Sequence, residues 1–262
     1  MTIEDQKKLA ITFCGMTFNS PLVLLSGCVG FGEEYTRVAG FSNRDVGAIC
    51  LKGTTEQPRL GNPAHRVYET PDGMLNAIGL QNPGVDKVVD EILPTLDFSE
   101  TRFIANLSGS TVEEYAEITR LFDESPIDAM EINISCPNVK EGGLAFGTSL
   151  KGATEVTAAV RKATSLPLIV KLSPNVTNIV DFALAVESAG ADAVSVINTL
   201  LGMSIDIRRR RPHLGNLFGG LSGPSIKPVA LRMVWQVAGA VKIPVIGIGG
   251  IMNGEDAVEF LM

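Results

Sequence analysis

The sequence predicts an α/β fold in which helices cover a parallel β-sheet. Short apolar runs recur along the chain, and each is followed by small or polar residues and then by a stretch with helical periodicity. Strands that alternate with helices in this way are typical of a parallel sheet buried on both faces. A polar or small residue ends every apolar run, and in a barrel these residues would form one ring around a ligand. We therefore expect a single domain over residues 1–262, a (β/α)8 TIM barrel.

The first expected element is a hairpin at about 9–19, ahead of the barrel. Barrel strands are expected at 21–25, 48–51, 103–105, 130–134, 168–170, 193–197 and 245–248. The residues that end them are Ser26, Lys52, Asn106, Asn133, Lys171, Asn198 and the pair Gly249 and Gly250. An open doubly wound sheet is the alternative, but its Gly-x-Gly-x-x-Gly fingerprint with a following acidic residue is not found.

Between the strands, helices and two long connections are predicted. Ser110-Thr111-Val112-Glu113 has the pattern of a capping box that opens a helix. The connections at 53–84 and 201–225 are long enough to act as lids or binding loops. In the first, Gly79 would let the backbone approach a ligand. In the second, the run Arg208–Arg211 is interpreted as a solvated surface segment, with docking to an acidic partner as the weaker alternative.

The composition of the chain argues against several classes of partner and metal site. With 262 residues, 45% of them hydrophobic, the chain can bury a large core, and its net charge of −7 argues against nucleic acid or an anionic membrane as partner. The N-terminus lacks an apolar signal core, and no apolar run reaches the ~18 residues that span a bilayer, so we expect a cytoplasmic protein. Four cysteines without a Cys-x-x-Cys pair, and two histidines, argue against an iron–sulfur, zinc or other metal site.

The most distinctive stretch is Glu131-Ile132-Asn133-Ile134-Ser135-Cys136-Pro137-Asn138. An apolar strand pattern runs into Pro137, which cannot continue a hydrogen-bonded ladder, so Cys136 lies where the strand becomes a turn. Asn133 and Asn138 flank the thiol, and their amides are costly to bury unless a polar ligand satisfies them. Cys136 is therefore a candidate reactive group, whereas Cys14, Cys28 and Cys50 are expected to be small buried hydrophobic residues.

Asn133-Ile134-Ser135-Cys136-Pro137-Asn138 closely resembles the catalytic loop of soluble dihydroorotate dehydrogenases, flavoproteins that oxidise dihydroorotate to orotate in pyrimidine (UMP) biosynthesis. Further segments resemble the same family, in family order: 26–32, 76–84, 171–175, 197–203 and 219–224. The serine that the membrane-bound class has in place of Cys136 is not found here. The resemblance is closest to the class 1B, NAD-linked catalytic subunit.

The resemblance implies bound FMN, with Cys136 as the base that removes the C5 proton of dihydroorotate while the C6 hydride goes to the flavin. It implies FMN contacts from Ser26, Lys52, Gly53, Asn106, Asn133, Lys171, Ile197, Gly223, Gly249 and Gly250. It implies substrate contacts from Lys52, Asn76, Ala77, Ile78, Gly79, Leu80, Asn133, Asn138, Asn198 and Thr199. Asparagine amides match the alternating donors and acceptors of the cyclic imide in the substrate that the resemblance implies, and a thiol with a pKa of about 8.5 is partly ionised near neutral pH.

The chain has neither a dinucleotide fingerprint nor a cysteine cluster, so its electrons must pass to another molecule. The class 1B resemblance implies a separate subunit that carries FAD and an iron–sulfur cluster and reduces NAD⁺, in a heterotetramer built on a homodimer. The alternatives are a class 1A enzyme that reduces fumarate, a dihydropyrimidine dehydrogenase-like flavin domain, and a non-catalytic barrel scaffold. The sequence ends at Met262 within the predicted helix 254–261, so the eighth strand and its phosphate loop are expected to lie outside these residues.

Overall fold

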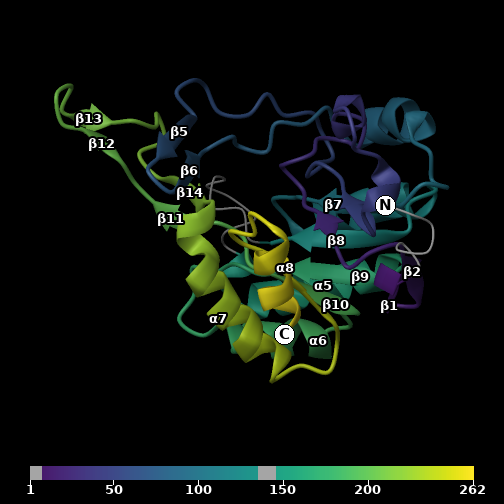
Figure 1. Cartoon of the computed structure of the whole chain (residues 1–262). Helices are drawn as coiled ribbons and strands as arrows, with labels where there is room; N and C mark the ends of the chain where they lie inside the picture. Colours follow the sequence, from purple (N-terminus) through teal and green to yellow (C-terminus); the bar gives the residue numbers. More distant parts are fainter. Residues whose placement is uncertain (1–7, 135–145) are drawn as a thin grey trace.

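A sheet of seven parallel strands forms the centre of the computed structural model, which describes residues 8–134 and 146–262 (Figure 1). Its strands are β3 (Val23–Leu24), β4 (Ala48–Cys50), β7 (Arg102–Leu107), β8 (Ala129–Asn133), β9 (Leu168–Lys171), β10 (Ala193–Val196) and β15 (Val245–Gly247). All seven lie where the apolar runs predict them, and the α/β fold is confirmed.

The strand order decides between the barrel and the open sheet. From one end of the sheet to the other it is β15-β10-β9-β8-β7-β4-β3, so each strand pairs with the next parallel strand along the chain. A doubly wound sheet would reverse direction at its centre. The sheet winds in one sense only, as in a TIM-type barrel, and β3 and β15 are its two outer strands.

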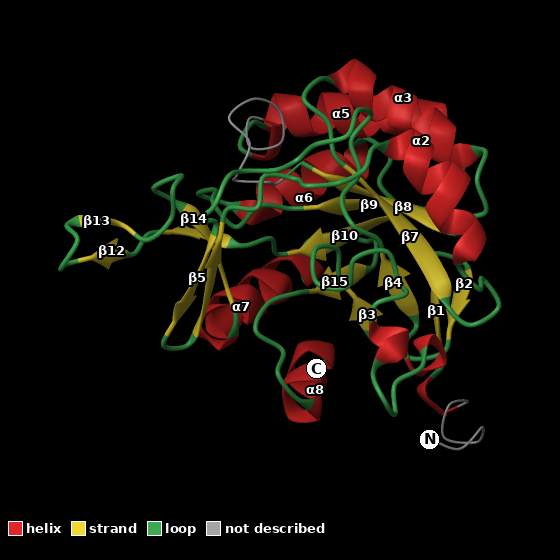
Figure 2. Cartoon of the chain, turned by 90° about the horizontal axis from the view of Figure 1, so that it is seen from above, coloured by secondary structure: helices red, strands yellow, loops and turns green. Residues whose placement is uncertain are grey.

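Helices pack along the outer face of the sheet (Figure 2). They are α2 (Val85–Lys87), α3 (Val112–Asp123), α5 (Leu150–Ala163), α6 (Ile179–Ser188), α7 (Lys227–Ala238) and α8 (Gly254–Leu261). Short helical turns are η1 (Tyr35–Arg37), η2 (Asn43–Asp45), η3 (Val88–Ile92), η4 (Leu93–Thr95) and η5 (Pro224–Ile226). Successive helices α3, α5, α6 and α7 are neighbours, which follows from the winding of the sheet.

The N-terminal cap of α3 lies one residue later than the sequence pattern indicates. The side chain of Thr111 accepts a hydrogen bond from the backbone N–H of Glu114, and the Glu114 carboxylate accepts one from the N–H of Ser110. The prediction that paired Ser110 with Glu113 is therefore wrong in register. Thr111 has the extended backbone of an N-cap residue, and the Thr-x-x-Glu spacing favours this pair equally well.

Side-chain alternation in the strands divides the interior into two cores. In β8, Met130 and Ile132 point outward into the core shared with the helices, whereas Ala129 belongs to the core inside the sheet. Because successive side chains of a strand point to opposite faces, Glu131 and Asn133 share the inner side with Ala129. The same strand thus supplies an apolar outer face and an increasingly polar inner one.

The predicted N-terminal hairpin is confirmed as β1 (Ile11–Phe13) and β2 (Met16–Phe18), which pair antiparallel. Phe13 and Phe18 are buried, and their ring centroids lie 5.2 Å apart. They pack against the lowest inner residues of five barrel strands, which are Ala48, Ile104, Ala129, Ile169 and Ala193. The hairpin therefore closes the amino-terminal end of the barrel interior.

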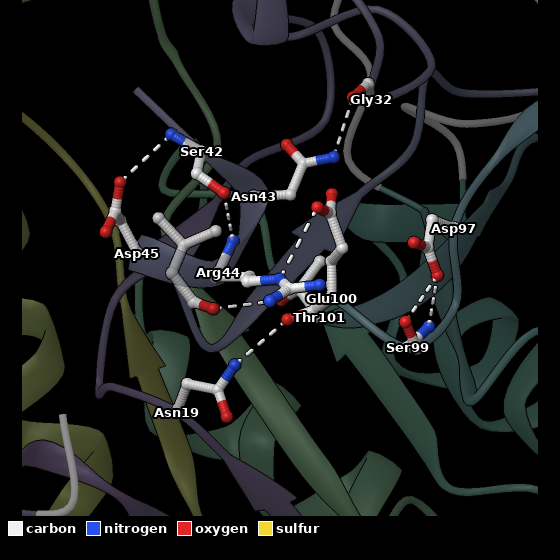
Figure 3. Close-up of polar contacts among 11 residues, drawn as sticks. Asn19, Gly32, Ser42, Asn43, Arg44, Asp45, Asp97, Ser99, Glu100 and Thr101 are labelled. Carbon is white, nitrogen blue, oxygen red and sulfur yellow. Dashed lines mark hydrogen bonds and ion pairs between the residues drawn. The ribbon is translucent and has the colours of Figure 1, made fainter. Parts of the chain in front are cut away.

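A polar network fixes the connections that enter β4 and β7 (Figure 3). Ser42 and Asp45 form a capping box at η2. The Asn43 amide donates to the Gly32 carbonyl at 3.1 Å, and Thr101 donates to the Val46 carbonyl at 2.9 Å. These contacts hold the segment before β4 against the segment before β7.

The two long connections contain strands that the sequence analysis did not predict. β5 (Val67–Thr70) and β6 (Gly73–Asn76) come from the first, and β11 (Leu200–Gly202) and β14 (Gly219–Ser222) from the second. Together they form one antiparallel sheet in the order β11-β14-β6-β5. A small hairpin, β12 (Ile205–Asp206) and β13 (Arg211–Pro212), projects beyond it, and Arg208–Arg211 are exposed there, as a solvated run requires (Figure 1).

Within the described ranges, none of the helices combines the length and apolar character required to cross a bilayer.

We predict that Phe18→Ala lowers the free energy of unfolding by ~3–5 kcal/mol, because it removes a ring that is 1% exposed and leaves a cavity in the barrel floor. The matched control is Thr12→Ala, an exposed position on the paired strand, with an expected change within about 0.5 kcal/mol. Urea unfolding followed by circular dichroism measures both. Equal effects would show that the hairpin does not seal the interior.

Candidate functional site

The carboxyl ends of five neighbouring strands bring the predicted polar residues together. The residues Lys52, Asn106, Asn133, Lys171 and Asn198 lie at or just after the ends of β4, β7, β8, β9 and β10. In the sheet register Asn133 is opposite Lys171, and Lys171 is opposite Ser195. Because the strands are parallel, these side chains meet at one mouth of the sheet, where barrel enzymes build their active sites.

Two of the predicted asparagines are in direct contact at this mouth. The amide of Asn198 donates to Oδ1 of Asn133 at 3.4 Å, and Oδ1 of Asn198 accepts from the backbone N–H of Thr199 at 2.8 Å. The buried Tyr115 hydroxyl donates to the carbonyl of Asn133 at 2.8 Å and so anchors the end of β8. Asn133, Asn198 and Thr199 therefore form one hydrogen-bonded group.

Directly below this group lies a residue to which the sequence analysis assigned no role, Glu131. Its Oε1 accepts from Asn106 Nδ2 at 2.6 Å and from the Cys50 thiol at 3.2 Å, and its Oε2 accepts from the Ser195 hydroxyl at 2.6 Å. A signal was present in the sequence, because Glu131 shares the inward face of β8 with the predicted site residue Asn133.

The interior contains one buried charge of each sign. Glu131 and Lys171 are both 4% exposed, and they are the only charged side chains that residues 8–134 and 146–262 bury. Both act on Cys50: burial raises the pKa of this thiol well above its usual value, the Glu131 carboxylate raises it further, and the Lys171 ammonium opposes them. The thiol stays protonated and donates its hydrogen to Glu131.

Beside this layer two buried oxygen atoms lack a partner. Oδ1 of Asn106 and Oγ of Ser108 are buried and have no hydrogen-bond partner in the described part of the chain. Gly53 lies against them: a Cβ there would be 2.8 Å from Asn106 Oδ1 and 3.2 Å from Ser108 Oγ. Buried polar atoms are nearly always hydrogen-bonded, so these two oxygens suit a ligand that carries donors.

Three glycines with expected FMN contacts are also brought together. Gly223, Gly249 and Gly250 have φ values of 101°, 134° and 74°. A Cβ on Gly250 would lie 2.9 Å from the Gly223 carbonyl oxygen, and one on Gly249 would lie 2.6 Å from Ala230 in α7. Only glycine fits this close approach to the start of α7, and backbone N–H groups beside a helix N-terminus favour a bound anion.

The loop at 76–80 reaches Gly53. Leu80 Cδ2 lies 3.7 Å from the position of a Gly53 Cβ, and Asn76 donates to the Gly220 carbonyl at 3.4 Å. Gly79 has φ 79°, and a Cβ there would lie 2.7–2.8 Å from atoms of Asn62. Both features require glycine at this position. Ala77 is buried, and Ile78 is half-buried.

The remaining predicted residues line the same mouth or fall outside the described ranges. Ser26 makes a backbone hydrogen bond to the Cys50 thiol, and the buried Ile197 donates its N–H to the Ile248 carbonyl at 3.1 Å. Cys136 and Asn138 lie outside the described residues. No cluster of three His, Cys, Asp or Glu side chains in the described ranges could hold a metal ion.

Of the other cysteines, only Cys50 is buried as expected. Cys14 is half-buried, and its thiol donates to the Asp192 carbonyl at 3.5 Å. Cys28 is exposed, so the prediction of a buried Cys28 is wrong. Cys28 lies in the 25–32 connection, where the chain forms turns after β3.

Comparison with known proteins places this arrangement in a family. A family model described as dihydroorotate dehydrogenase matches residues 8–262. Similar curated proteins are named dihydroorotate dehydrogenase B (NAD(+)), catalytic subunit. That of Geobacillus sp. (strain WCH70) is 53% identical over 254 residues, which cover 97% of this chain and 80% of the relative. Those of Desulforamulus reducens and Geobacter metallireducens are 54% and 55% identical over 255 residues, covering 97% of this chain and 83% of each relative.

The thiols provide a test of this geometry. Burial, followed by the negative charge of Asp192, raises the pKa of Cys14 to about 11, so its thiol stays protonated to higher pH than an ordinary cysteine. At pH 8 only roughly a thousandth of Cys14 would be thiolate. Among these three cysteines, we predict that iodoacetamide labels Cys28 first. Labelling of Cys14 should be slow at pH 8, with a rate that rises towards pH 11, and Cys50 should be labelled only after unfolding. Peptide mass spectrometry after timed pulses measures each site, and equal rates at Cys14 and Cys28 would contradict the prediction.

Proposed function

This chain belongs to the dihydroorotate dehydrogenase family of oxidoreductases, and on that basis we propose that it oxidises dihydroorotate to orotate in pyrimidine biosynthesis. The observation that carries the proposal is the family match over residues 8–262, joined to the polar ring at the mouth of the sheet. We take residues 1–262 as one domain and the cytoplasm as its compartment.

The proposed cofactor is FMN. Its flavin would contact Ser26, Lys52, Gly53, Asn106, Asn133, Lys171, Ile197 and Gly223, and its phosphate would lie at Gly249 and Gly250. Two observations support this proposal: Asn106 Oδ1 and Ser108 Oγ are buried without partners in the described residues, and Lys171 is buried at the end of β9. When bound, FMN supplies the acceptor for the hydride that leaves C6 of the substrate.

The substrate would be held by paired amides. Dihydroorotate carries a cyclic imide and a carboxylate, and each asparagine offers both a donor and an acceptor. Asn133 and Asn198 already contact one another, and Asn76 lies on β6 at the start of the 76–80 loop. The remaining proposed contacts are Lys52, Ala77, Ile78, Gly79, Leu80, Asn138 and Thr199.

Cys136 is the proposed base that takes the proton from C5. The motif that contains it supports this proposal, since Asn133, its first residue, ends β8 at the mouth of the sheet. Proton removal by a thiolate at the opposite side of the ring from the hydride acceptor completes the oxidation.

We propose NAD⁺ as the final electron acceptor, reached through a partner subunit. The names of the relatives support this, because each is called a catalytic subunit and specifies NAD(+). The partner would carry FAD and an iron–sulfur cluster, and a homodimer of this chain with two partner subunits would form the heterotetramer. Fumarate is the acceptor in the class 1A alternative.

We predict that Cys136→Ala abolishes rapid bleaching of the flavin by dihydroorotate but keeps FMN bound, because only the proton acceptor is lost. Stopped-flow absorbance measures the rate, and Cys14→Ala on the remote hairpin is the control. A rate in Cys136→Ala equal to that of the control would remove Cys136 from the mechanism. If the flavin were bleached by dihydrouracil rather than dihydroorotate, the dihydropyrimidine dehydrogenase alternative would be favoured, whereas a colourless protein would favour the scaffold.

We also predict that the purified chain reduces artificial dyes readily and NAD⁺ at least about a hundredfold more slowly, since a direct route to the dinucleotide is not expected. Adding the partner subunit should restore NAD⁺ reduction. Fast reduction of fumarate by the chain alone would favour class 1A, and fast reduction of NAD⁺ by it would contradict the need for a partner.

A further inference from the structure

The starting observation is the position of Glu131. Its carboxylate is 4% exposed and receives donors from β4, β7 and β10 through Cys50, Asn106 and Ser195. A buried carboxylate without such partners would be strongly unfavourable. The three donors satisfy its oxygens and hold it in one place between the apolar barrel floor and the asparagine group.

One consequence concerns the amide of Asn106. A carboxylate only accepts hydrogen bonds, so it selects the Nδ2 side of this amide, and the 2.6 Å contact uses that donor. The opposite atom, Oδ1, must then face Gly53, where it is buried without a partner. Glu131 therefore decides that Asn106 presents an acceptor towards Gly53.

A second consequence concerns charge. Glu131 and Lys171 are the two buried charged side chains of the described ranges, they have opposite signs, and both lie near enough to influence Cys50. A buried ammonium without a compensating charge destabilises a fold. Glu131 supplies a side chain of opposite charge in the same interior as Lys171.

We infer that Glu131 is a positioning residue of the flavin site: it orients the Asn106 amide and offsets the charge of Lys171, and it thereby sets the reduction potential of the bound flavin. The inference rests on the proposed function for its flavin part. The compensation of the Lys171 charge by Glu131 concerns the folded chain itself and does not depend on a bound flavin.

The experiment is a double-mutant cycle with Glu131→Gln, Lys171→Gln and both together. Glutamine keeps the shape of each side chain approximately and removes the charge. Urea midpoints are measured for the cofactor-free proteins, and reduction potentials for the FMN-loaded ones. Ser195→Ala is the matched control, because it removes one donor to Glu131 and leaves both charges in place.

We expect Glu131→Gln to lower the urea midpoint and raise the flavin potential, because a negative charge near the reduced flavin is lost. Lys171→Gln should lower the potential. The double variant should recover much of the midpoint and lie between the single variants in potential. Ser195→Ala should lower the midpoint slightly and leave the potential unchanged.

An unchanged potential in Glu131→Gln, or a double variant whose losses are simply the sum of the single ones, would overturn the inference. If Glu131→Gln does not fold but the double variant does, charge balance is supported; if neither folds, it is overturned, since a neutral interior would then not suffice. A wild-type protein that binds no FMN would defeat the proposed function, while the urea measurements would still test the balance of charges.

Discussion

One buried carboxylate connects the interior of this sheet. Glu131 takes hydrogen bonds from three other strands, and each bond is strong because it forms where water is excluded. Below it the interior is apolar and closed by Phe13 and Phe18. Above it are the amides of Asn133 and Asn198. The polar site can therefore lie deep in the sheet because this carboxylate and Lys171 separate it from the apolar floor.

The register of the parallel strands determines which side chains lie at the same level of the sheet. Side chains two residues apart point the same way, so Ala129, Glu131 and Asn133 form successive levels on one strand. Neighbouring strands add their own members at each level. The register of the parallel strands is therefore enough to bring these polar side chains together, and the result agrees with the family match.

Much of this arrangement is predictable from the sequence, and the failures have physical causes. The seven strands are found because apolar runs between turn residues are a strong local signal. β5, β6, β11 and β14 are missed because they contain Glu69, Gly73 and Gly219-Gly220, residue types that are depleted in strands, and because one of their three pairings, β14 with β6, joins the two connections.

Glu131 illustrates a different limit. Its residue type is visible in the sequence, but its importance depends on three donors that lie 81, 25 and 64 residues away along the chain. Charge on the inward face of a strand signals a buried network, yet only the strand order tells which partners complete it. The asparagines, by contrast, could be assigned early because each one ends its own strand.

The antiparallel sheet beside the site has a consequence for how the protein folds. Asn76 in β6 and Gly220 in β14 are 144 residues apart, so pairing them closes a very long loop at a high entropic cost. The barrel strands, whose partners are closer in sequence, can form first. β6 can pair early with the adjacent β5, but it gains its second partner, β14, only when nearly the whole chain has been arranged. We therefore expect the ability to recognise a ligand to be among the last properties that the folding chain acquires.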